Sequence, residues 1–224
     1  MNKQQLLHML EAAALAYQDV QPRLFDTNIT IIDDSETGMQ CWLRQENSLL
    51  TITFRGTDSN TDRKNDLSFF KKVIPYGNTC SKIRVHSGFL SAYKPDRIRK
   101  RIHCCITDQV KRVQIAGHSL GAAMAVLCAV DLQYHFPDLD YEVALFGCPR
   151  VGNRAFQKSY NKRVYKTLRV ENGNDIITKV PLACMGYRHV GIRIPVGMLR
   201  LPFVYSANQH RTQEYYKQLW KNMC

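Results

Sequence analysis

The chain has 224 residues, of which 45% are hydrophobic and 22% charged, and its formal net charge is +12. This apolar content excludes an intrinsically disordered chain, because such a chain lacks the hydrophobic area that offsets the entropy cost of ordering. No apolar run approaches the roughly 20 residues needed to span a bilayer, and the length suits one α/β domain, so we expect a single domain over residues 1–224.

Helix-like and strand-like segments alternate along the chain. At the N-terminus, Leu6, Leu10, Ala13 and Tyr17 fall at helical spacing and predict an amphipathic helix. In chain order, the segments expected as strands are 50–54, 112–116, 141–146, 164–170 and 187–194, and further helices are expected over 120–134 and 209–221. This alternation is typical of an α/β fold, in which helices cover a central sheet.

The cysteines and the N-terminus bear on the cellular compartment. None of the eight cysteines belongs to a CxxC pair, and no Cys or His spacing matches a zinc-binding motif, so we expect reduced thiols, no metal site and no cofactor. Glutamines and Glu11 interrupt the apolar N-terminal stretch, which therefore predicts a folded helix rather than a cleaved signal peptide. Both observations favour an intracellular protein.

The surplus of positive charge is consistent with binding to nucleic acid, with binding to an anionic lipid surface, or with solubility alone. The basic clusters at residues 97–101, 111–112 and 162–163 do not alternate with aromatic residues, as a base-stacking surface requires. No zinc-finger or RNP pattern is present. We therefore expect no nucleic-acid partner, and the sequence indicates no particular oligomeric state.

The strongest chemical signal is Gly117-His118-Ser119-Leu120-Gly121, between the expected strand 112–116 and the expected helix 120–134. A serine in this context is typical of a tight strand-to-helix turn, where flanking glycines remove side chains that would collide. The N-terminus of the following helix supplies free backbone N–H groups and a positive dipole end, both suited to a developing oxyanion. The pattern predicts Ser119 as a nucleophile.

A serine nucleophile needs a base and a group that orients the base. On a strand–serine–helix fold the expected chain order is Ser, then Asp or Glu, then His. Asp175 follows the expected strand 164–170 at the edge where ligand sites form on open sheets, and only His189 and His210 follow it. We favour His210, because His189 lies within the alternating run of a strand, whereas His210 is expected at an exposed helix start.

At these residues the chain resembles the class 3 lipases, which are fungal-lipase-like α/β hydrolases. The resemblance runs from about residue 10 to the C-terminus, and its motifs stand in the family's order: 53–57 (TFRGT), 65–67 (NDL), 85–89 (VHSGF), 117–121 (GHSLG), 147–153 (GCPRVGN), 172–175 (NGND), 180–181 (VP), and His210 followed by Tyr215. It implies an α/β-hydrolase fold, with a mostly parallel central sheet and helices on both faces.

The resemblance also implies a catalytic triad of Ser119, Asp175 and His210, and an oxyanion hole formed by Thr57 and Leu120. His86 precedes the serine, which is the wrong order for the base on this fold, so we expect a buried structural histidine there. The apolar residues within 58–82 suggest a lid or an acyl-chain wall, with an ordinary packed connection as the alternative.

The activity implied by this resemblance is hydrolysis of carboxylic esters of acylglycerols or phospholipids through an acyl-enzyme. The expected partners are a lipid ester substrate and a lipid surface, which the charge suggests is anionic. An acyltransferase with the same triad and a catalytically silent lipid-binding protein remain as alternatives.

Overall fold

The computed structural model describes residues 1–17, 28–56, 71–73, 80–198 and 204–221, and for 71–73 only the backbone. Among these residues, no helix combines the length and the apolar character needed to cross a membrane. The segment 58–82 falls mostly outside the described residues, so its interpretation as a lid stays a prediction, as does the organisation of residues 1–224 as one domain.

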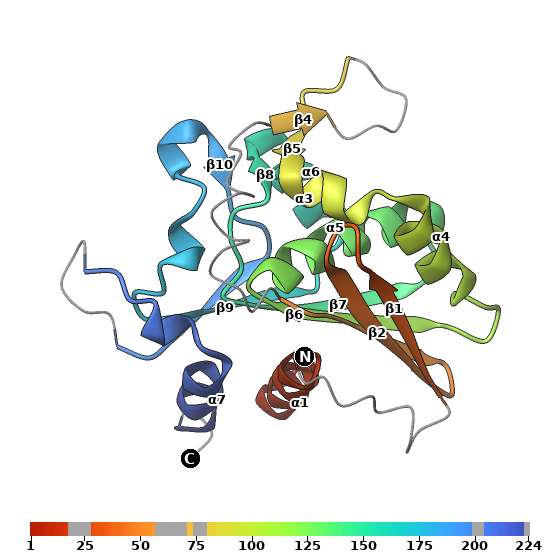
Figure 1. Cartoon of the computed structure of the whole chain (residues 1–224), viewed down its shortest axis with the longest axis horizontal. Coiled ribbons are helices and arrows are strands. Elements are labelled where there is room, and N and C mark those ends of the chain that lie inside the picture. Colours follow the sequence, from red (N-terminus) through yellow and green to blue (C-terminus); the bar gives the residue numbers. More distant parts are fainter. Residues whose placement is uncertain (18–27, 57–70, 74–79, 199–203, 222–224) are drawn as a thin grey trace.

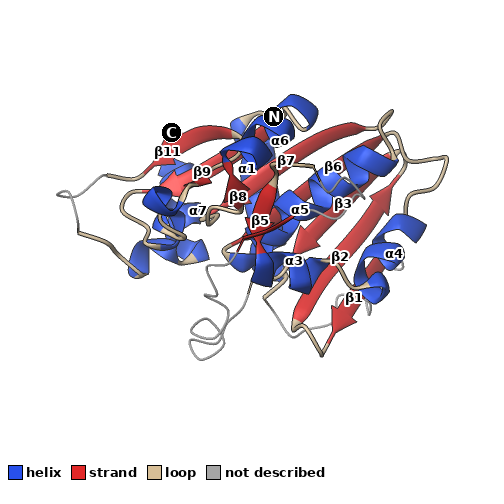
Figure 2. Cartoon of the chain, turned by 90° about the horizontal axis from the view of Figure 1, so that it is seen from above, coloured by secondary structure: helices blue, strands red, loops and turns tan. Residues whose placement is uncertain are grey.

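A seven-stranded sheet runs through the molecule in the order β1-β2-β3-β6-β7-β9-β11 (Figure 2). Its strands are β1 (Ile29–Asp34), β2 (Met39–Glu46), β3 (Leu49–Phe54), β6 (Arg112–His118), β7 (Asp140–Phe146), β9 (Thr167–Asn172) and β11 (Ile192–Val196). The first three strands pair antiparallel, and every neighbouring pair from β3 to β11 is parallel. The expected mostly parallel sheet is confirmed, with β9 beginning three residues later than predicted.

Helices cover both faces of this sheet (Figure 1). They are α1 (Lys3–Leu15), α3 (Ser87–Tyr93), α4 (Asp96–Cys104), α5 (Leu120–His135), α6 (Arg154–Arg163) and α7 (Thr212–Lys221). On one face, α1 and α7 pack with β6, β7 and β9 in a core that includes Leu10, Phe146 and Leu219. The larger core lies on the other face, beneath α3 to α6. Burial on both faces explains why β7 ends in an unbroken apolar run.

A smaller sheet joins β4 (Lys71–Val73), β5 (Arg84–His86), β8 (Gly152–Asn153) and β10 (Tyr187–Arg188) in the order β10-β8-β5-β4. It corrects one prediction, because the single strand expected over 187–194 is two strands in different sheets. Tyr187 pairs with Asn153, whereas Ile192 pairs with Leu168 of β9. Gly191, with φ +71°, lies between them and lets the chain turn from one sheet to the other.

The two terminal helices differ from prediction only at their ends. Asn2 and Gln5 form a capping box at the start of α1, with reciprocal hydrogen bonds of 2.7 and 2.8 Å. Tyr17 lies beyond the end of this helix rather than within it. At the other terminus, a 3₁₀ turn over Asn208–His210 precedes α7, so His210 lies before the helix and not in its first turn.

Candidate active site

Ser119 lies between the end of β6 and the start of α5, in a backbone conformation (φ 59°, ψ −126°) that non-glycine residues rarely adopt. The turn is tight on both sides. A Cβ on Gly117 would lie 2.3 Å from the Gly121 carbonyl oxygen, and one on Gly121 would lie 2.4 Å from the Phe54 carbonyl oxygen. Backbone atoms cannot move aside as a flexible side chain does, so this strand-to-helix turn, called the elbow below, requires both glycines.

The structure brings Ser119, His210 and Asp175 into one hydrogen-bonded chain. The Ser119 Oγ lies 2.7 Å from His210 Nε2, and His210 Nδ1 lies 2.8 Å from Asp175 Oδ2. With its proton on Nδ1, the imidazole donates to the carboxylate and leaves Nε2 to accept from the serine hydroxyl. All three residues are buried, with exposed fractions of 5% for Ser119 and His210 and 0% for Asp175.

The burial of His210 corrects the exposed position expected from the sequence. Its imidazole lies against that of His118, with ring centroids 4.5 Å apart and the ring planes tilted by 30°. His118 Nε2–H donates to the His210 carbonyl (2.6 Å), because a carbonyl can only accept. On the other side of the ring, the Tyr17 hydroxyl oxygen lies 2.9 Å from His118 Nδ1. Residues 172–174 also hold the turn through Gln209. A backbone fixed at several points orients the ring toward Ser119.

The strand β9 ends at Asn172, and Asp175 follows after Gly173 and Asn174, at the carboxyl edge of the parallel strands. Its Oδ1 accepts a hydrogen bond from the Ile177 backbone N–H (2.8 Å), and its Oδ2 accepts from the Tyr215 hydroxyl (2.6 Å) as well as from His210. Burial by itself raises the pKa of Asp175, but the bonds from His210 and Tyr215 outweigh burial and hold the pKa below its usual range. The carboxylate is therefore ionised at neutral pH.

His189, the alternative base, lies in a different environment. Its Nε2–H donates to the Thr178 carbonyl (2.8 Å), and the same nitrogen lies 3.6 Å from the Glu171 carboxylate. Burial and the neighbouring Arg169 and Arg150 lower the pKa of His189 to about 3. Its described contacts tie it to the structure around Glu171 and not to Ser119, which favours His210 as the base.

The oxyanion residues are placed only in part. Leu120 is the first residue of α5, so its backbone N–H has no acceptor in a preceding helical turn and remains available at the start of the helix. Thr57 lies outside the described residues, and so does Asp66. The role of Thr57 stays a prediction. His86 is buried as expected, and its Nδ1 accepts from the Phe89 backbone N–H at 3.4 Å.

Tyr215 and His118 hold the candidate triad in place, although the sequence predicts neither role. Tyr215 is fully buried in α7, and its hydroxyl donates to Asp175 while accepting from the Asn172 backbone N–H at 3.2 Å. The only signal available was that Tyr215 stands five residues after His210 in the family's order. Its role depends on the packing of α7 against the end of β9, which the sequence pattern does not show.

Tyr215→Phe is expected to lower the free energy of unfolding by about 1.5–3 kcal/mol at neutral pH, because it removes a hydrogen bond to a charged group. The lowered pKa of Asp175 gives the sign of the pH dependence. The ionised carboxylate stabilises the fold fully above the pKa that Asp175 has in the unfolded chain, and this stabilisation disappears as the pH falls through the pKa of the folded state. The deficit of the variant should therefore narrow below about pH 4. Urea unfolding at neutral and acid pH measures the difference in the free energy of unfolding between the variant and the native chain. An equal difference at both pH values would mean that the variant lost packing and not the hydrogen bond.

Comparison with known proteins places these features in a family. The model of the family "Lipase (class 3)" matches residues 51–185. The chain is 37% identical over 149 residues to the chloroplastic phospholipase A(1) DAD1 of Arabidopsis thaliana, covering 59% of this chain and 33% of that protein. It is 31% identical over 177 residues to a lipase of Rhizomucor miehei, covering 75% of this chain and 44% of that protein. The chain thus matches less than half of the length of these relatives.

Solved structures share the fold. A fungal lipase–inhibitor complex superposes with a TM-score of 0.74 at 22% identity, covering 93% of this chain and 92% of the other. The family match spans the elbow and Asp175, and the superposition supports the α/β-hydrolase architecture. On these grounds, the chain belongs to the class 3 lipase family.

Proposed function

We propose that the protein is a serine hydrolase that cleaves carboxylic esters of acylglycerols or phospholipids. The observation that carries this proposal is the 2.7 Å contact between Ser119 Oγ and His210 Nε2, in a buried chain that ends on Asp175. A serine hydroxyl is a poor nucleophile without a base, and an imidazole held by a carboxylate is the base that it needs.

The proposed reaction has two half-reactions. Ser119 attacks the ester carbonyl while His210 Nε2 takes the hydroxyl proton, and Asp175 stabilises the imidazolium that forms. The backbone N–H of Leu120, joined by Thr57, stabilises the tetrahedral oxyanion. His210 then protonates the departing alcohol, which leaves an acyl group on Ser119. Water, deprotonated by His210, attacks the acyl-enzyme and releases the fatty acid.

The surroundings of the site support a lipid substrate. Large apolar side chains are exposed on the two segments that flank Asp175 and His210: Ile176, Leu182, Met185, Val204 and Tyr205. Residues 174–176 and 204–206 meet beside the triad, because Asp175 and Ser206 form an isolated β-bridge and the Asn174 side chain donates to the Val204 carbonyl at 2.6 Å. An apolar rim of this kind suits acyl chains. The relatives' names, lipase and phospholipase A(1), agree with this substrate class.

The experiment that tests the proposal is a substrate panel with the purified chain. Diacylglycerol, phosphatidylcholine and phosphatidylglycerol would be presented as dispersed lipids, and p-nitrophenyl esters as soluble substrates. We expect release of free fatty acid from at least one lipid class and a stoichiometric loss of activity with a fluorophosphonate. Folded protein that releases no fatty acid and reacts with no fluorophosphonate would contradict the proposal.

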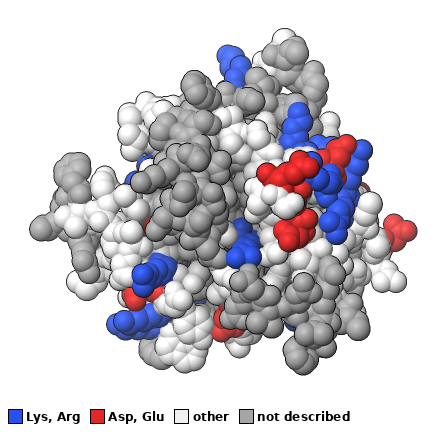
Figure 3. All heavy atoms as spheres, in the orientation of Figure 1, with Lys and Arg blue, Asp and Glu red and all other residues white. Residues whose placement is uncertain are grey.

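Part of the positive charge is neutralised within the protein. On the face in Figure 3, basic and acidic side chains gather together over α4 and the adjoining end of β1. Arg97 pairs there with Asp34 and Glu36, and Lys100 pairs with Asp96. The basic cluster at 97–101 is therefore a weaker candidate for lipid contact than the sequence alone suggests.

Positive charge also gathers beside the loop that carries Asp175. Burial and repulsion from Arg188 lower the pKa of Arg150, and burial and repulsion from Arg193 and Arg150 lower the pKa of Lys179. Glu171 offsets part of this charge through Arg169 and Arg193. The excess near the site supports the further proposal that the protein acts at an anionic lipid surface.

Hydrolysis is expected to be faster on vesicles that contain phosphatidylglycerol than on neutral phosphatidylcholine vesicles, with the advantage shrinking as salt rises. Each basic residue near such a surface contributes about 1 kcal/mol to the free energy of binding. Lys71 and Lys72 lie within the segment 58–82 that is expected as a lid, so Lys71→Glu with Lys72→Glu should weaken vesicle binding on the order of tenfold or more. Vesicle sedimentation and fatty-acid release measure the two effects.

The matched control is Lys111→Glu with Arg112→Glu, which makes the same charge change at the start of β6, at the opposite end of the strand from Ser119. It should leave the preference for anionic vesicles largely intact. Soluble short-chain esters should be hydrolysed equally by all three proteins. Equal rates of hydrolysis on neutral and anionic vesicles at low salt would refute the proposal that the protein acts at an anionic lipid surface. They would not affect the serine hydrolase proposal.

An intracellular location stays a prediction. The described cysteines are free thiols, which agrees with the reduced state expected from the sequence. The Arabidopsis relative is named as chloroplastic and a Malassezia globosa relative as secreted, so compartments differ within the family. Fractionation of cells that express the chain tests this prediction directly.

A further inference from the structure

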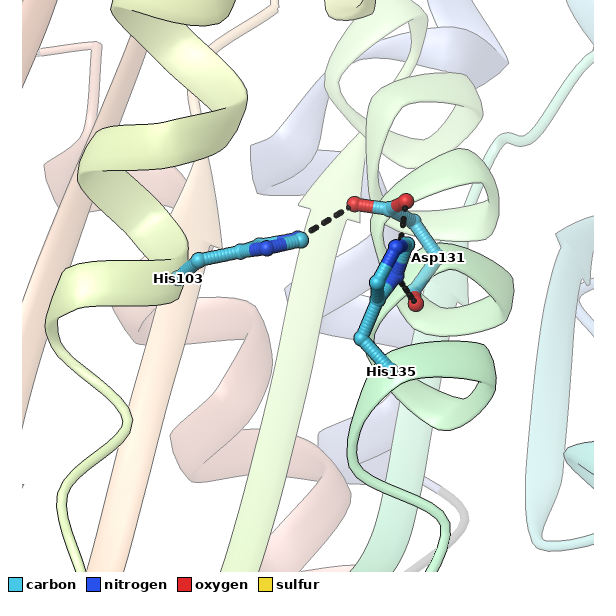
Figure 4. A group of neighbouring side chains, drawn as sticks. All are labelled: His103, Asp131 and His135. Carbon is cyan, nitrogen blue, oxygen red and sulfur yellow. Dashed lines mark hydrogen bonds and ion pairs between the residues drawn. The ribbon is translucent and has the colours of Figure 1, made fainter. Parts of the chain in front are cut away.

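Three side chains that the proposed reaction does not use converge between α4 and the C-terminal end of α5 (Figure 4). His103 lies in the last turn of α4, and Asp131 and His135 lie one turn apart on α5, at the i,i+4 spacing that places them on one helix face. Asp131 is twelve residues from Ser119, or about 18 Å along the helix. This cluster is therefore separate from the triad.

The three residues already stand close to a metal-binding arrangement. His103 Nε2 lies 2.7 Å from Asp131 Oδ2. His135 Nδ1 lies 3.4 Å from Asp131 Oδ1, and its N–H donates to the Asp131 backbone carbonyl at 2.9 Å, a bond that a metal ion would replace. One ligand atom from each residue can be chosen so that all lie within 4.8 Å of one another, the only such group of three found among the described residues. Tetrahedral zinc with bonds of about 2.0–2.1 Å holds its ligand atoms roughly 3.3 Å apart. Small side-chain movements would bring this set to that spacing.

The chemistry of the donors selects a class of ion. Two imidazole nitrogens with one carboxylate suit Zn²⁺ and neighbouring transition metals, whereas Ca²⁺ and Mg²⁺ prefer oxygen ligands alone. The histidine side chains are partly exposed, 19% for His103 and 34% for His135, so an ion can enter and a water molecule can complete the coordination. Asp131, at 3% exposed, forms the buried wall of the site.

A neighbouring hydroxyl holds the carboxylate in position. Tyr93 O–H donates to Asp131 Oδ2 at 2.9 Å, which is the kind of outer hydrogen bond that orients metal-ligating carboxylates. Arg99 lies 3.9 Å from Asp131 Oδ1, so one positive charge already stands beside the carboxylate.

We propose that His103, Asp131 and His135 bind one Zn²⁺ ion that ties α4 to α5, with water as the fourth ligand. Sequence patterns could not reveal it, because His103 and Asp131 come from different helices and lie 28 residues apart. Without the ion, the same residues form a hydrogen-bonded cluster in which a proton on the imidazole takes the place of the metal. The site plays no part in ester cleavage.

The test is titration of the metal-free protein with Zn²⁺ alone, followed by isothermal calorimetry, and with Co²⁺, whose visible absorption reports tetrahedral coordination. We expect saturable binding of one ion per chain. At Zn²⁺ concentrations about 100 times the dissociation constant, the melting temperature should rise by roughly 5–10 °C. These readouts do not depend on activity, so they separate this proposal from the proposed function.

His103→Gln and His135→Gln should each raise the dissociation constant on the order of 100-fold and abolish the thermal shift, because each removes a ligand. His8→Gln is the matched control: His8 is an exposed histidine of α1, far along the chain from the cluster, and its loss should leave zinc binding unchanged. Circular dichroism verifies that each variant is folded. Absence of one-to-one zinc binding, or binding that survives in both cluster variants, would overturn the proposal.

Discussion

Ser119→Ala is expected to lower kcat for ester hydrolysis by about three orders of magnitude or more and to abolish covalent labelling by fluorophosphonates. In the proposed mechanism the hydroxyl oxygen bonds to the acyl group, and its 2.7 Å contact with His210 Nε2 makes it the group that this base can activate. The residual rate would come only from substrate binding and the oxyanion donors. Steady-state kinetics and gel fluorescence measure the two effects.

This variant is expected to fold normally. Alanine keeps the Cβ of serine, so the tight turn between β6 and α5 accommodates it as well as the native residue. Melting curves close to those of the native chain together with native-like labelling would show that another residue is the nucleophile.

His210→Ala is expected to be nearly as damaging to kcat as the loss of the serine, because the members of one catalytic unit act non-additively. Without the imidazole, Ser119 has no base, and Asp175 loses the hydrogen bond at 2.8 Å that links it to the reaction. Addition of Ser119→Ala to His210→Ala should therefore change the rate little further. Kinetics of the two single variants and the double variant measure this non-additivity.

His189→Ala provides the matched comparison, since it removes a second histidine, 15% exposed at its side chain, that lies after Asp175 in the chain. It should lower the free energy of unfolding by about 1–3 kcal/mol, because the Thr178 carbonyl loses its donor inside the protein. Its kcat should stay near the native value. If His189→Ala instead abolished turnover while His210→Ala only reduced stability, the assignment of the base would be reversed.

The parts of the fold that sequence reasoning predicted are those with strong local signals. In β3 and the first half of β6 apolar and polar residues alternate, β7 ends in an apolar run, and the turn at Ser119 carries its own glycines because backbone atoms approach so closely there. Local sequence determines such features, so Ser119 and Asp175 were both recognisable at the ends of strands.

The features that escaped prediction depend on contacts between distant segments. The alternating run from Tyr187 to Ile194 satisfies the pattern of one strand, and only the positions of β8 and β9 show that its two halves pair in different sheets. The burial of His210 likewise arises from His118 and from the loop at 172–174 that fixes its turn. Periodicity carries no information about such neighbours.

The measurement that tests the central claim most directly is peptide mass spectrometry of the native protein after reaction with a fluorophosphonate. The account predicts one adduct per chain, on Ser119, formed much more slowly in His210→Ala because that imidazole activates the hydroxyl. An adduct on any other residue of active protein, or modification of Ser119 at an undiminished rate without His210, would contradict the proposed Ser119–His210–Asp175 mechanism.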